Sequence, residues 1–231
     1  RRGSQQARRE DGAPAPCNST AEEKYLTGLF DDVSKSNTKS YLTEIFEICN
    51  YKFNGEEYIL PKVESHDWNL GNHHNKKVVG LNTGCGERWT SRLWNFDYWV
   101  KLIELLKSKD YFVLLLGGKQ EDDRNMQLSK ITGAKYTGFH SLPKFISLMN
   151  ECNTVVTAVT MGLHLAIGLR KKVILMNNIF NPNEFELYNR GSIVQPAKEC
   201  KCYFAPKCKN TDDYFCLDSL TPEMVFEAIE K

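Results

Sequence analysis

Short apolar runs that alternate with helical patterns constrain the fold of this chain most strongly. The runs lie at residues 78–81 (VVGL), 111–116 (YFVLLL), 154–158 (TVVTA) and 173–176 (VILM). Runs of this length and composition predict strands, and a run as apolar as 111–116 is typical of a strand buried on both faces. The alternation predicts an α/β fold, with a Rossmann-like parallel sheet and helices on both of its faces.

The segments between these runs carry apolar side chains at helical spacing, as Phe96, Trp99, Ile103 and Leu106 show. Thr221-Pro222-Glu223 predicts the start of a last helix, with threonine as the capping residue and proline at the first position. The other predicted helices span residues 95–108, 121–132, 142–149 and 163–169, and a further short strand is expected at 134–137.

The chain before residue 78 has a different character. Residues 1–21 are polar and rich in proline, glycine and alanine, which predicts a disordered leader. Residues 22–60 carry two helical apolar patterns, and the polar, turn-rich residues 62–77 form the best linker candidate. The predicted organisation is therefore a leader (1–21), a short helical region with a linker (22–77) and the α/β domain (78–231).

Composition excludes several classes of function. The chain has a formal net charge of +1, which gives no electrostatic reason to expect nucleic acid as a partner. No apolar run approaches the roughly 20 residues that span a bilayer, so no transmembrane segment is expected.

The turn after the first predicted strand is the leading candidate for a binding site. Gly84 and Gly86 allow a ligand to approach the backbone closely, and Arg88 and Arg92 offer forked donors for phosphate. A strand, a glycine turn and a helix together place free N–H groups against an anion. An ordinary turn with solvated arginines is the alternative interpretation.

Two other strand ends carry polar residues. Glu121 follows Gly117-Gly118, where doubly wound sheets place an acceptor for ribose hydroxyls, although a glutamate also favours a helix N-terminus. Thr160 and His164 lie where the strand 154–158 runs into the next helix. A single histidine on an otherwise apolar helix is also consistent with a core residue.

These motifs, in this order, resemble those of the family 9 glycosyltransferases, the lipopolysaccharide heptosyltransferases and their relatives. The resemblance extends from Val78 to the C-terminus, and residues 22–60 resemble the end of the N-terminal domain of the family. The matching segments are NTGCGERWTSRLW (82–94), LLLGGKQE (114–121), TAVTMGLHLAIGL (157–169), VILMNNIFNP (173–182) and TPEMVFEAI (221–229).

The resemblance implies a GT-B fold, in which residues 78–231 would be the C-terminal domain that binds a nucleotide-sugar donor. Residues 22–77 would be a remnant of the N-terminal acceptor domain with a linker. Arg92 would take the place of the phosphate-binding lysine of the family, and Glu121 would bind the ribose. The donor-binding residues implied are Gly84, Cys85, Gly86, Arg88, Arg92, Glu121, Thr160, Gly162 and His164.

The implied activity is transfer of a heptose-like sugar, with ADP-heptose as the leading donor and no further cofactor. The acceptor would be lipopolysaccharide or another envelope glycan, met in the cytoplasm at the inner face of the membrane by peripheral association. Val159 and Met161 replace an aspartate and a glycine of the family motif. The segment that carries the general base of the family has no counterpart, so no catalytic residue is assigned. A catalytically incomplete nucleotide-binding fragment remains an alternative.

The C-terminal cysteines leave three interpretations open, because a C-x-C pair differs from the usual C-x2-C zinc spacing. They are reduced structural thiols, a structural metal site, or disulfides. A metal site is not the preferred interpretation. A structural module held together by this tail is a further alternative to an enzyme. The cysteines are Cys200, Cys202, Cys208 and Cys216.

Overall fold

The fold is taken from a computed structural model, which describes residues 6–8, 12, 14–16, 18–71, 73, 75–209 and 215–231. The chain divides into two compact units. The larger unit comprises residues 57–179 and 189–231, and the smaller one comprises residues 1–56 and 180–188. The cysteine tail and the motifs at residues 82–94, 114–121 and 157–169 all belong to the larger unit.

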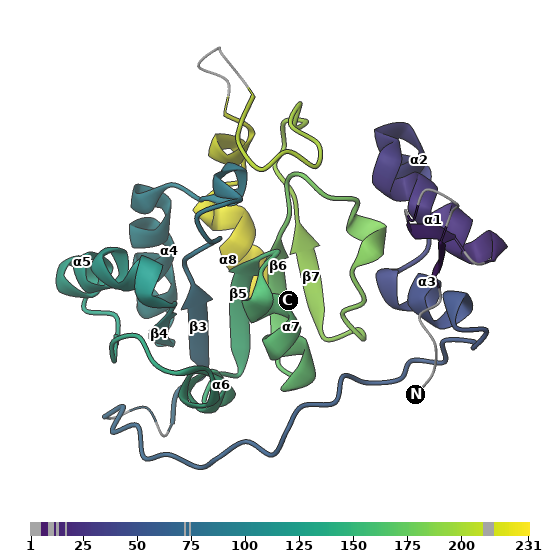
Figure 1. The fold of residues 1–231 in the computed structure, drawn as a ribbon. Helices are drawn as coiled ribbons and strands as arrows, with labels where there is room; N and C mark the ends of the chain where they lie inside the picture. The colour runs from purple at the N-terminus through teal and green to yellow at the C-terminus, as the bar shows by residue number, and fades with distance from the viewer. Residues whose placement is uncertain are drawn as a thin grey trace. The chain divides into compact units, whose positions relative to one another are not determined.

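The larger unit is built on a parallel five-stranded sheet, which confirms the predicted α/β fold (Figure 1). The strand order is β4-β3-β5-β6-β7, and every pairing within it is parallel. The strands are β3 (Val78–Asn82), β4 (Phe112–Leu116), β5 (Thr154–Ala158), β6 (Lys172–Met176) and β7 (Gly191–Val194). The short strand β7 was not predicted, because its four residues form an edge and are only partly apolar.

The prediction of a full strand at 134–137 is wrong. Lys135 forms a single parallel bridge beside β4, with its N–H donating to Val113 and its carbonyl accepting from Leu115. Gly133 and Gly138 flank this bridge with φ of +69° and +87°. The left-handed backbone at these glycines turns the chain away on both sides, so no second pair of ladder bonds forms.

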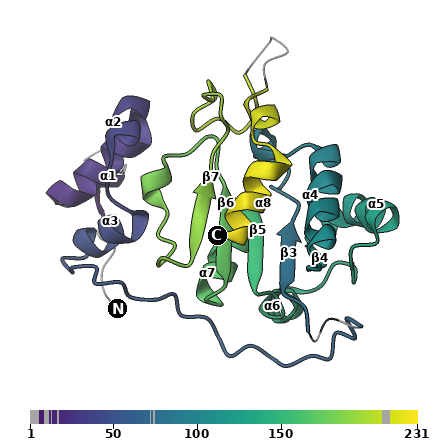
Figure 2. The same ribbon diagram turned by 180° about the vertical axis from the view of Figure 1, so that it is seen from behind.

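Helices cover both faces of the sheet. On one face, α4 (Phe96–Ser108), α5 (Asp122–Thr132) and α8 (Pro222–Glu230) enclose the main hydrophobic core, and Figure 2 shows α4 and α8 in front of the strands. On the other face lie α6 (Leu142–Asn150) and α7 (Met161–Gly168), seen in front in Figure 1. The predicted start of the last helix is confirmed, because the Thr221 side chain accepts from the Met224 N–H and Pro222 is the first helical residue.

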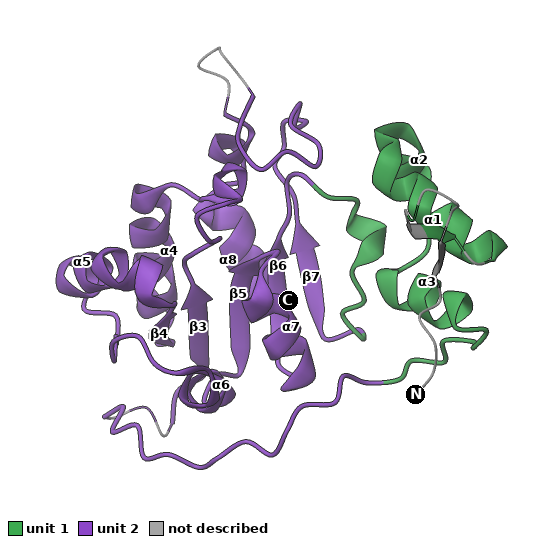
Figure 3. Ribbon diagram, in the orientation of Figure 1, with its two compact units in different colours: residues 1–56, 180–188 green, residues 57–179, 189–231 purple. Residues whose placement is uncertain are grey.

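The smaller unit consists of short helices and a loop from later in the sequence (Figure 3). Asn181, in that loop, donates from Nδ2 to the carbonyls of Ser34 and Asn37, each at 2.7 Å. The elements are β1 (Gln6–Arg8), β2 (Pro14–Pro16), α1 (Ser19–Leu29), α2 (Asp31–Ser36), α3 (Tyr41–Ile48) and the 3₁₀ turn η3 (Pro182–Glu184). Of the leader predicted for residues 1–21, the structure describes β1, β2, Gly12 and the start of the helical region, and the rest lies outside the described residues.

Candidate functional site

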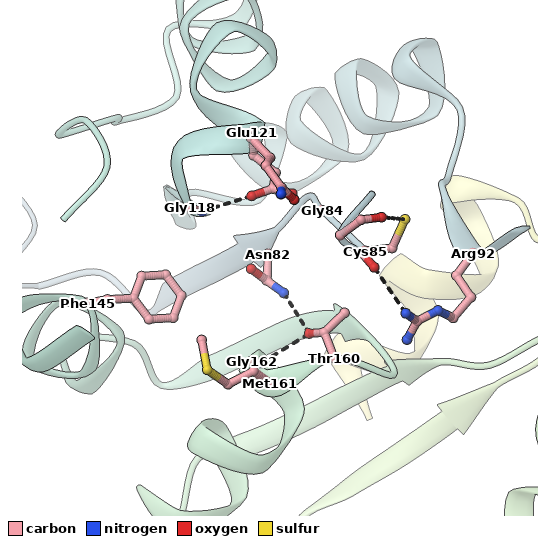
Figure 4. Close-up of a pocket in the computed structure, with 12 residues that line it drawn as sticks. Asn82, Gly84, Cys85, Arg92, Gly118, Glu121, Phe145, Thr160, Met161 and Gly162 are labelled. Atoms are coloured by element: carbon pink, nitrogen blue, oxygen red, sulfur yellow. Dashed lines mark hydrogen bonds between the residues drawn. The ribbon is translucent and has the colours of Figure 1, made fainter. Parts of the chain in front are cut away.

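A cavity of about 300 Å³ opens where the strand order of the sheet reverses. β4 pairs with one edge of β3 and β5 with the other, and parallel sheets bind ligands at the carboxyl ends of strands at such a switch point. Figure 4 shows the cavity with Arg92 at one end and Phe145 at the other. Its lining residues are Asn82, Gly84, Cys85, Gly86, Arg92, Gly118, Gln120, Glu121, Phe145, Thr160, Met161 and Gly162.

The glycine turn after β3 is held in place by buried polar groups. Thr83 donates from its backbone N–H to the Leu116 carbonyl and from its hydroxyl to Asn125 Oδ1, at 3.3 and 2.6 Å. The Asn125 amide donates to the same Leu116 carbonyl at 3.2 Å. Beyond this anchor, Gly86 has φ of +72°, a backbone conformation that favours glycine. These contacts fix the start of the turn to β4 and α5.

Arg92 places a buried positive charge at the cavity. It belongs to the 3₁₀ turn η1 (Thr90–Arg92) and is only 8% exposed. Its Nη2 donates to the Cys85 carbonyl at 3.0 Å, and its guanidinium lies 5.5 Å from the centre of the Trp89 ring. Burial lowers the pKa of Arg92 from a very high ordinary value. The group stays charged at neutral pH, which suits it to an anionic ligand.

Glu121 fills the space that a side chain at residue 84 would need. It ends the 3₁₀ turn η2 (Lys119–Glu121), and its Oε2 accepts from the Gly118 N–H at 2.9 Å. A Cβ on Gly84 would lie 2.0 Å from Glu121 Oε1 and 2.2 Å from Cδ. Because glycine has no side chain, residue 84 leaves room for the Glu121 carboxylate against the turn.

We expect Gly84→Ala to fold but to displace the Glu121 carboxylate from the Gly118 N–H. The loss of this hydrogen bond predicts a fall of about 0.5–1.5 kcal/mol in the free energy of unfolding, measured by urea denaturation. In a Glu121→Ala background the same substitution should cost much less, because the atoms that clash are gone. Equal costs in both backgrounds would contradict this account of Gly84.

Helix α7 begins at the cavity. Thr160 caps it by accepting from the Gly162 N–H at 3.1 Å, and the same hydroxyl accepts from Asn82 Nδ2 at 3.1 Å. Asn82 Nδ2 also donates to Thr157 Oγ1 at 2.9 Å. A Cβ on Gly162 would lie 2.7 Å from Asn82 Nδ2, so glycine permits this close packing. The positive end of the α7 dipole therefore lies beside the cavity, which Thr160, Met161 and Gly162 line.

All of the predicted donor-binding residues except Arg88 and His164 line the cavity. Cys85 is a buried lining residue, and burial raises the pKa of its thiol, which stays protonated at neutral pH. Arg88 is exposed and lies beside Trp89. His164 stacks against Tyr58, with Nδ1 3.2 Å from the hydroxyl, and desolvation lowers the pKa of His164.

The sequence did not single out several residues that the fold brings to the cavity. Asn82 was recognisable only as a polar residue at the end of a buried strand. Phe145 is apolar, and no local pattern distinguished it from a core residue, whereas Met161 was named in the sequence only as the replacement for a glycine of the family motif. The remaining additions are Gly118 and Gln120.

The four C-terminal cysteines carry thiols in the structure. Cys202 Sγ and Cys208 Sγ lie 3.6 Å apart, and the Cys202 N–H donates to Cys200 Sγ at 3.4 Å. Among the residues that the structure describes, no group of three or more His, Cys, Asp or Glu side chains is arranged to hold a metal ion. In the same residues, no helix combines the length and apolar character needed to cross a membrane.

The reversed strand order, the glycine turn and the site at the strand ends define a Rossmann-like domain of the GT-B type. The family model described as glycosyltransferase family 9 (heptosyltransferase) matches residues 29–212. The chain therefore belongs to this family.

Solved structures share the fold at low sequence identity. ADP-heptose lipopolysaccharide heptosyltransferase II of E. coli matches with a TM-score of 0.54 and 16% identity, over 68% of this chain and 46% of that protein. A family 9 glycosyl transferase of Veillonella parvula matches with a TM-score of 0.64 and 16% identity, over 84% of this chain and 60% of that protein. The E. coli heptosyltransferase WaaC with ADP-2-deoxy-2-fluoro heptose matches with a TM-score of 0.51 and 20% identity, over 70% of this chain and 45% of that protein.

The aligned part of this chain covers about half the length of the two E. coli heptosyltransferases. A comparison with curated proteins finds no match.

Proposed function

We propose that this chain carries the donor-binding part of a glycosyltransferase that moves a heptose-like sugar from a nucleoside diphosphate. The supporting observation is the convergence of a glycine turn, the buried Arg92 and the start of α7 on one cavity. A relative with the same fold was solved with an ADP-heptose analogue, which supports ADP-heptose as the leading donor.

In this proposal each lining group has a part in donor binding. The backbone at Gly84, Cys85 and Gly86 and the guanidinium of Arg92 hold the diphosphate, while Glu121 accepts from the ribose hydroxyls. Thr160 and Gly162 bring the α7 N-terminus toward the phosphates and sugar. Transfer breaks the bond between the anomeric carbon and the diphosphate, so negative charge develops where these donors point, and their main contribution is to stabilise the leaving group.

The far wall of the cavity differs from the motif of the family. Met161 stands at the position of its glycine and lines the cavity together with Phe145. Val159 stands at the position of its aspartate, so the donor sugar would meet no carboxylate there. The acceptor in this proposal is lipopolysaccharide or another envelope glycan, reached at the cytoplasmic face of the membrane. No residue is assigned as the general base. Arg88 and His164 do not line the cavity.

Titration calorimetry of the full chain with ADP tests the proposal. We expect saturable binding that Glu121→Gln weakens about tenfold, because a charge-assisted hydrogen bond to the ribose is lost. With 2′,3′-dideoxy-ADP, which lacks those hydroxyls, wild type and variant should bind alike. Glu151→Gln changes an exposed carboxylate outside the cavity and serves as the matched control. No saturable heat from ADP, GDP, UDP or CDP with a folded chain would contradict donor binding.

A further inference from the structure

The segment at residues 203–207 holds the 3₁₀ turn η1, which carries Arg92. Ser91, the neighbour of Arg92 in this turn, is 3% exposed. Its hydroxyl donates to the Ala205 carbonyl at 2.6 Å, and its N–H donates to the Pro206 carbonyl at 3.1 Å. Two successive carbonyls therefore hold η1, so the position of this turn depends on the conformation of the segment.

The segment also contacts the residue before η1. The Phe204 ring packs edge-to-face on Trp89, with ring centroids 5.7 Å apart, and the Phe204 N–H donates to the Ile179 carbonyl at 2.8 Å. The Ala205 N–H donates back to the Cys202 carbonyl at 3.0 Å, which closes a tight turn. The segment is therefore a compact support for η1, and its own turn starts at a cysteine.

Cysteines flank this segment at both ends, and their sulfurs are in contact. Cys202 Sγ and Cys208 Sγ lie 3.6 Å apart. The Lys209 N–H, from the residue after Cys208, donates to Cys202 Sγ at 3.1 Å and so joins the two ends. A disulfide has an S–S distance of about 2.05 Å, so the sulfurs need a short approach to bond. Cys202 is 4% exposed, whereas Cys208 is half-buried, so a reagent from solvent reaches Cys208 first.

We propose that Cys202 and Cys208 form a thiol–disulfide modification site, and that its closure locks the segment that holds η1. The oxidant is a small disulfide of the glutathione class. Cys208 loses its proton to solvent, and its thiolate attacks the small disulfide and releases one thiolate. Cys202 then loses its proton, attacks the Cys208 sulfur of the mixed disulfide and releases the second thiolate. Two protein thiols are oxidised, and one small disulfide is reduced to two thiols.

Closure of this disulfide restricts the segment. The bond joins residues six positions apart in the chain, and a cross-link limits the opened conformations of such a loop. We expect the Ser91 N–H to exchange with solvent about tenfold more slowly after oxidation, because the segment must open for this group to exchange. A firmer η1 should also strengthen ADP binding about twofold to fivefold, since Arg92 has less conformational freedom to lose on binding. This effect on the donor site rests on the proposed function, whereas the modification site itself does not.

The test compares the full chain reduced by a phosphine with the chain oxidised by glutathione disulfide. After alkylation of the free thiols, trypsin cleaves after Lys201, Lys207 and Lys209, which places the tail cysteines on separate peptides. Mass spectrometry should find peptides 202–207 and 208–209 joined in the oxidised chain and separate in the reduced chain.

Hydrogen exchange at Ser91 is the second readout, and it needs no nucleotide. The exchange should slow when the wild-type chain is oxidised. Cys208→Ser should remove this change, whereas Cys200→Ser, a matched substitution in the same tail, should keep both the joined peptides and the slower exchange. ADP calorimetry of the two redox states measures the effect on the donor site.

Three results would overturn this inference. One is a peptide map in which 202–207 and 208–209 are not joined, and another is equal exchange at Ser91 in the two redox states. The third is stoichiometric metal on the purified chain, with all four tail thiols protected from alkylation until a chelator is added. Equal ADP affinity in the two states would overturn the effect on the donor site. Absence of ADP binding in both states would instead refute the proposed function, while the peptide map and the exchange data still decide the modification site.

Discussion

Replacing Arg92 with alanine is expected to weaken ADP binding about 10- to 100-fold. The substitution removes a charged partner of the diphosphate, and hydrogen bonds to charged groups contribute about 1.5–3 kcal/mol each. It also removes the donor to the Cys85 carbonyl, a contact that joins η1 to the glycine turn. Because Arg92 is buried at the cavity, solvent screens its charge less than that of a surface arginine. Titration calorimetry at constant ionic strength measures the effect.

Two variants separate the contribution of charge from that of geometry. Arg92→Lys keeps the positive charge but loses the planar fork, so we expect an affinity between wild type and Arg92→Ala. Arg88→Ala removes an arginine of the same segment that is exposed and does not line the cavity, so its loss should be much smaller. An equal loss at both positions would mean that the diphosphate does not lie at Arg92. Circular dichroism of each variant checks that the fold is retained.

Truncation of Trp94 to alanine is expected to lower the free energy of unfolding by about 3–5 kcal/mol. Trp94 is 2% exposed and packs edge-to-face on Trp99, with ring centroids 4.7 Å apart. Its Nε1 also donates to the Leu220 carbonyl at 2.8 Å. The alanine variant therefore loses buried apolar area and leaves both a cavity and an unmatched carbonyl where the segment before α8 meets α4. Urea denaturation measures the loss.

Trp94→Phe divides this cost between packing and hydrogen bonding. Phenylalanine keeps most of the apolar area but lacks the indole N–H, so we expect a loss of about 1–3 kcal/mol. Phe139→Ala is the surface control, because Phe139 is 47% exposed and its truncation should cost about 0.5 kcal/mol or less. A Trp94→Ala loss near that of the control would contradict the central place of Trp94 in the core.

Much of the fold follows from patterns that lie within single segments. The runs at 78–81, 111–116, 154–158 and 173–176 became buried parallel strands, and the spacing in 95–108 became α4. The failures lie at the edges of the sheet. β7 has a weak apolar pattern, and the segment around Lys135 forms one bridge because flanking glycines turn the chain. Edge pairing depends on long-range geometry, which a local pattern does not encode.

The candidate site was predictable where it depends on backbone chemistry. Gly84, Gly86 and Arg92 could be recognised as candidates because a glycine turn between a strand and a helix places free N–H groups against an anion, with an ordinary turn as the alternative. Asn82 and Phe145 could not, because their place at the cavity depends on which strand ends are neighbours and on how α6 packs. The contact of Ser91 with the segment at 205–206 was hidden for the same reason, since more than a hundred residues separate the partners.

By itself, the sequence determined the parallel α/β fold, because apolar periodicity and turn chemistry act over a few residues, and the order of its motifs gave the resemblance to the family. Only the tertiary structure decided that Arg92, Glu121 and the start of α7 surround one cavity, and that the cysteine tail contacts the turn beside Arg92. The physical reason is that strand order and helix packing arise from the burial of apolar surface across the whole domain. Those long-range contacts, and not any local preference, bring the polar groups of separate segments together.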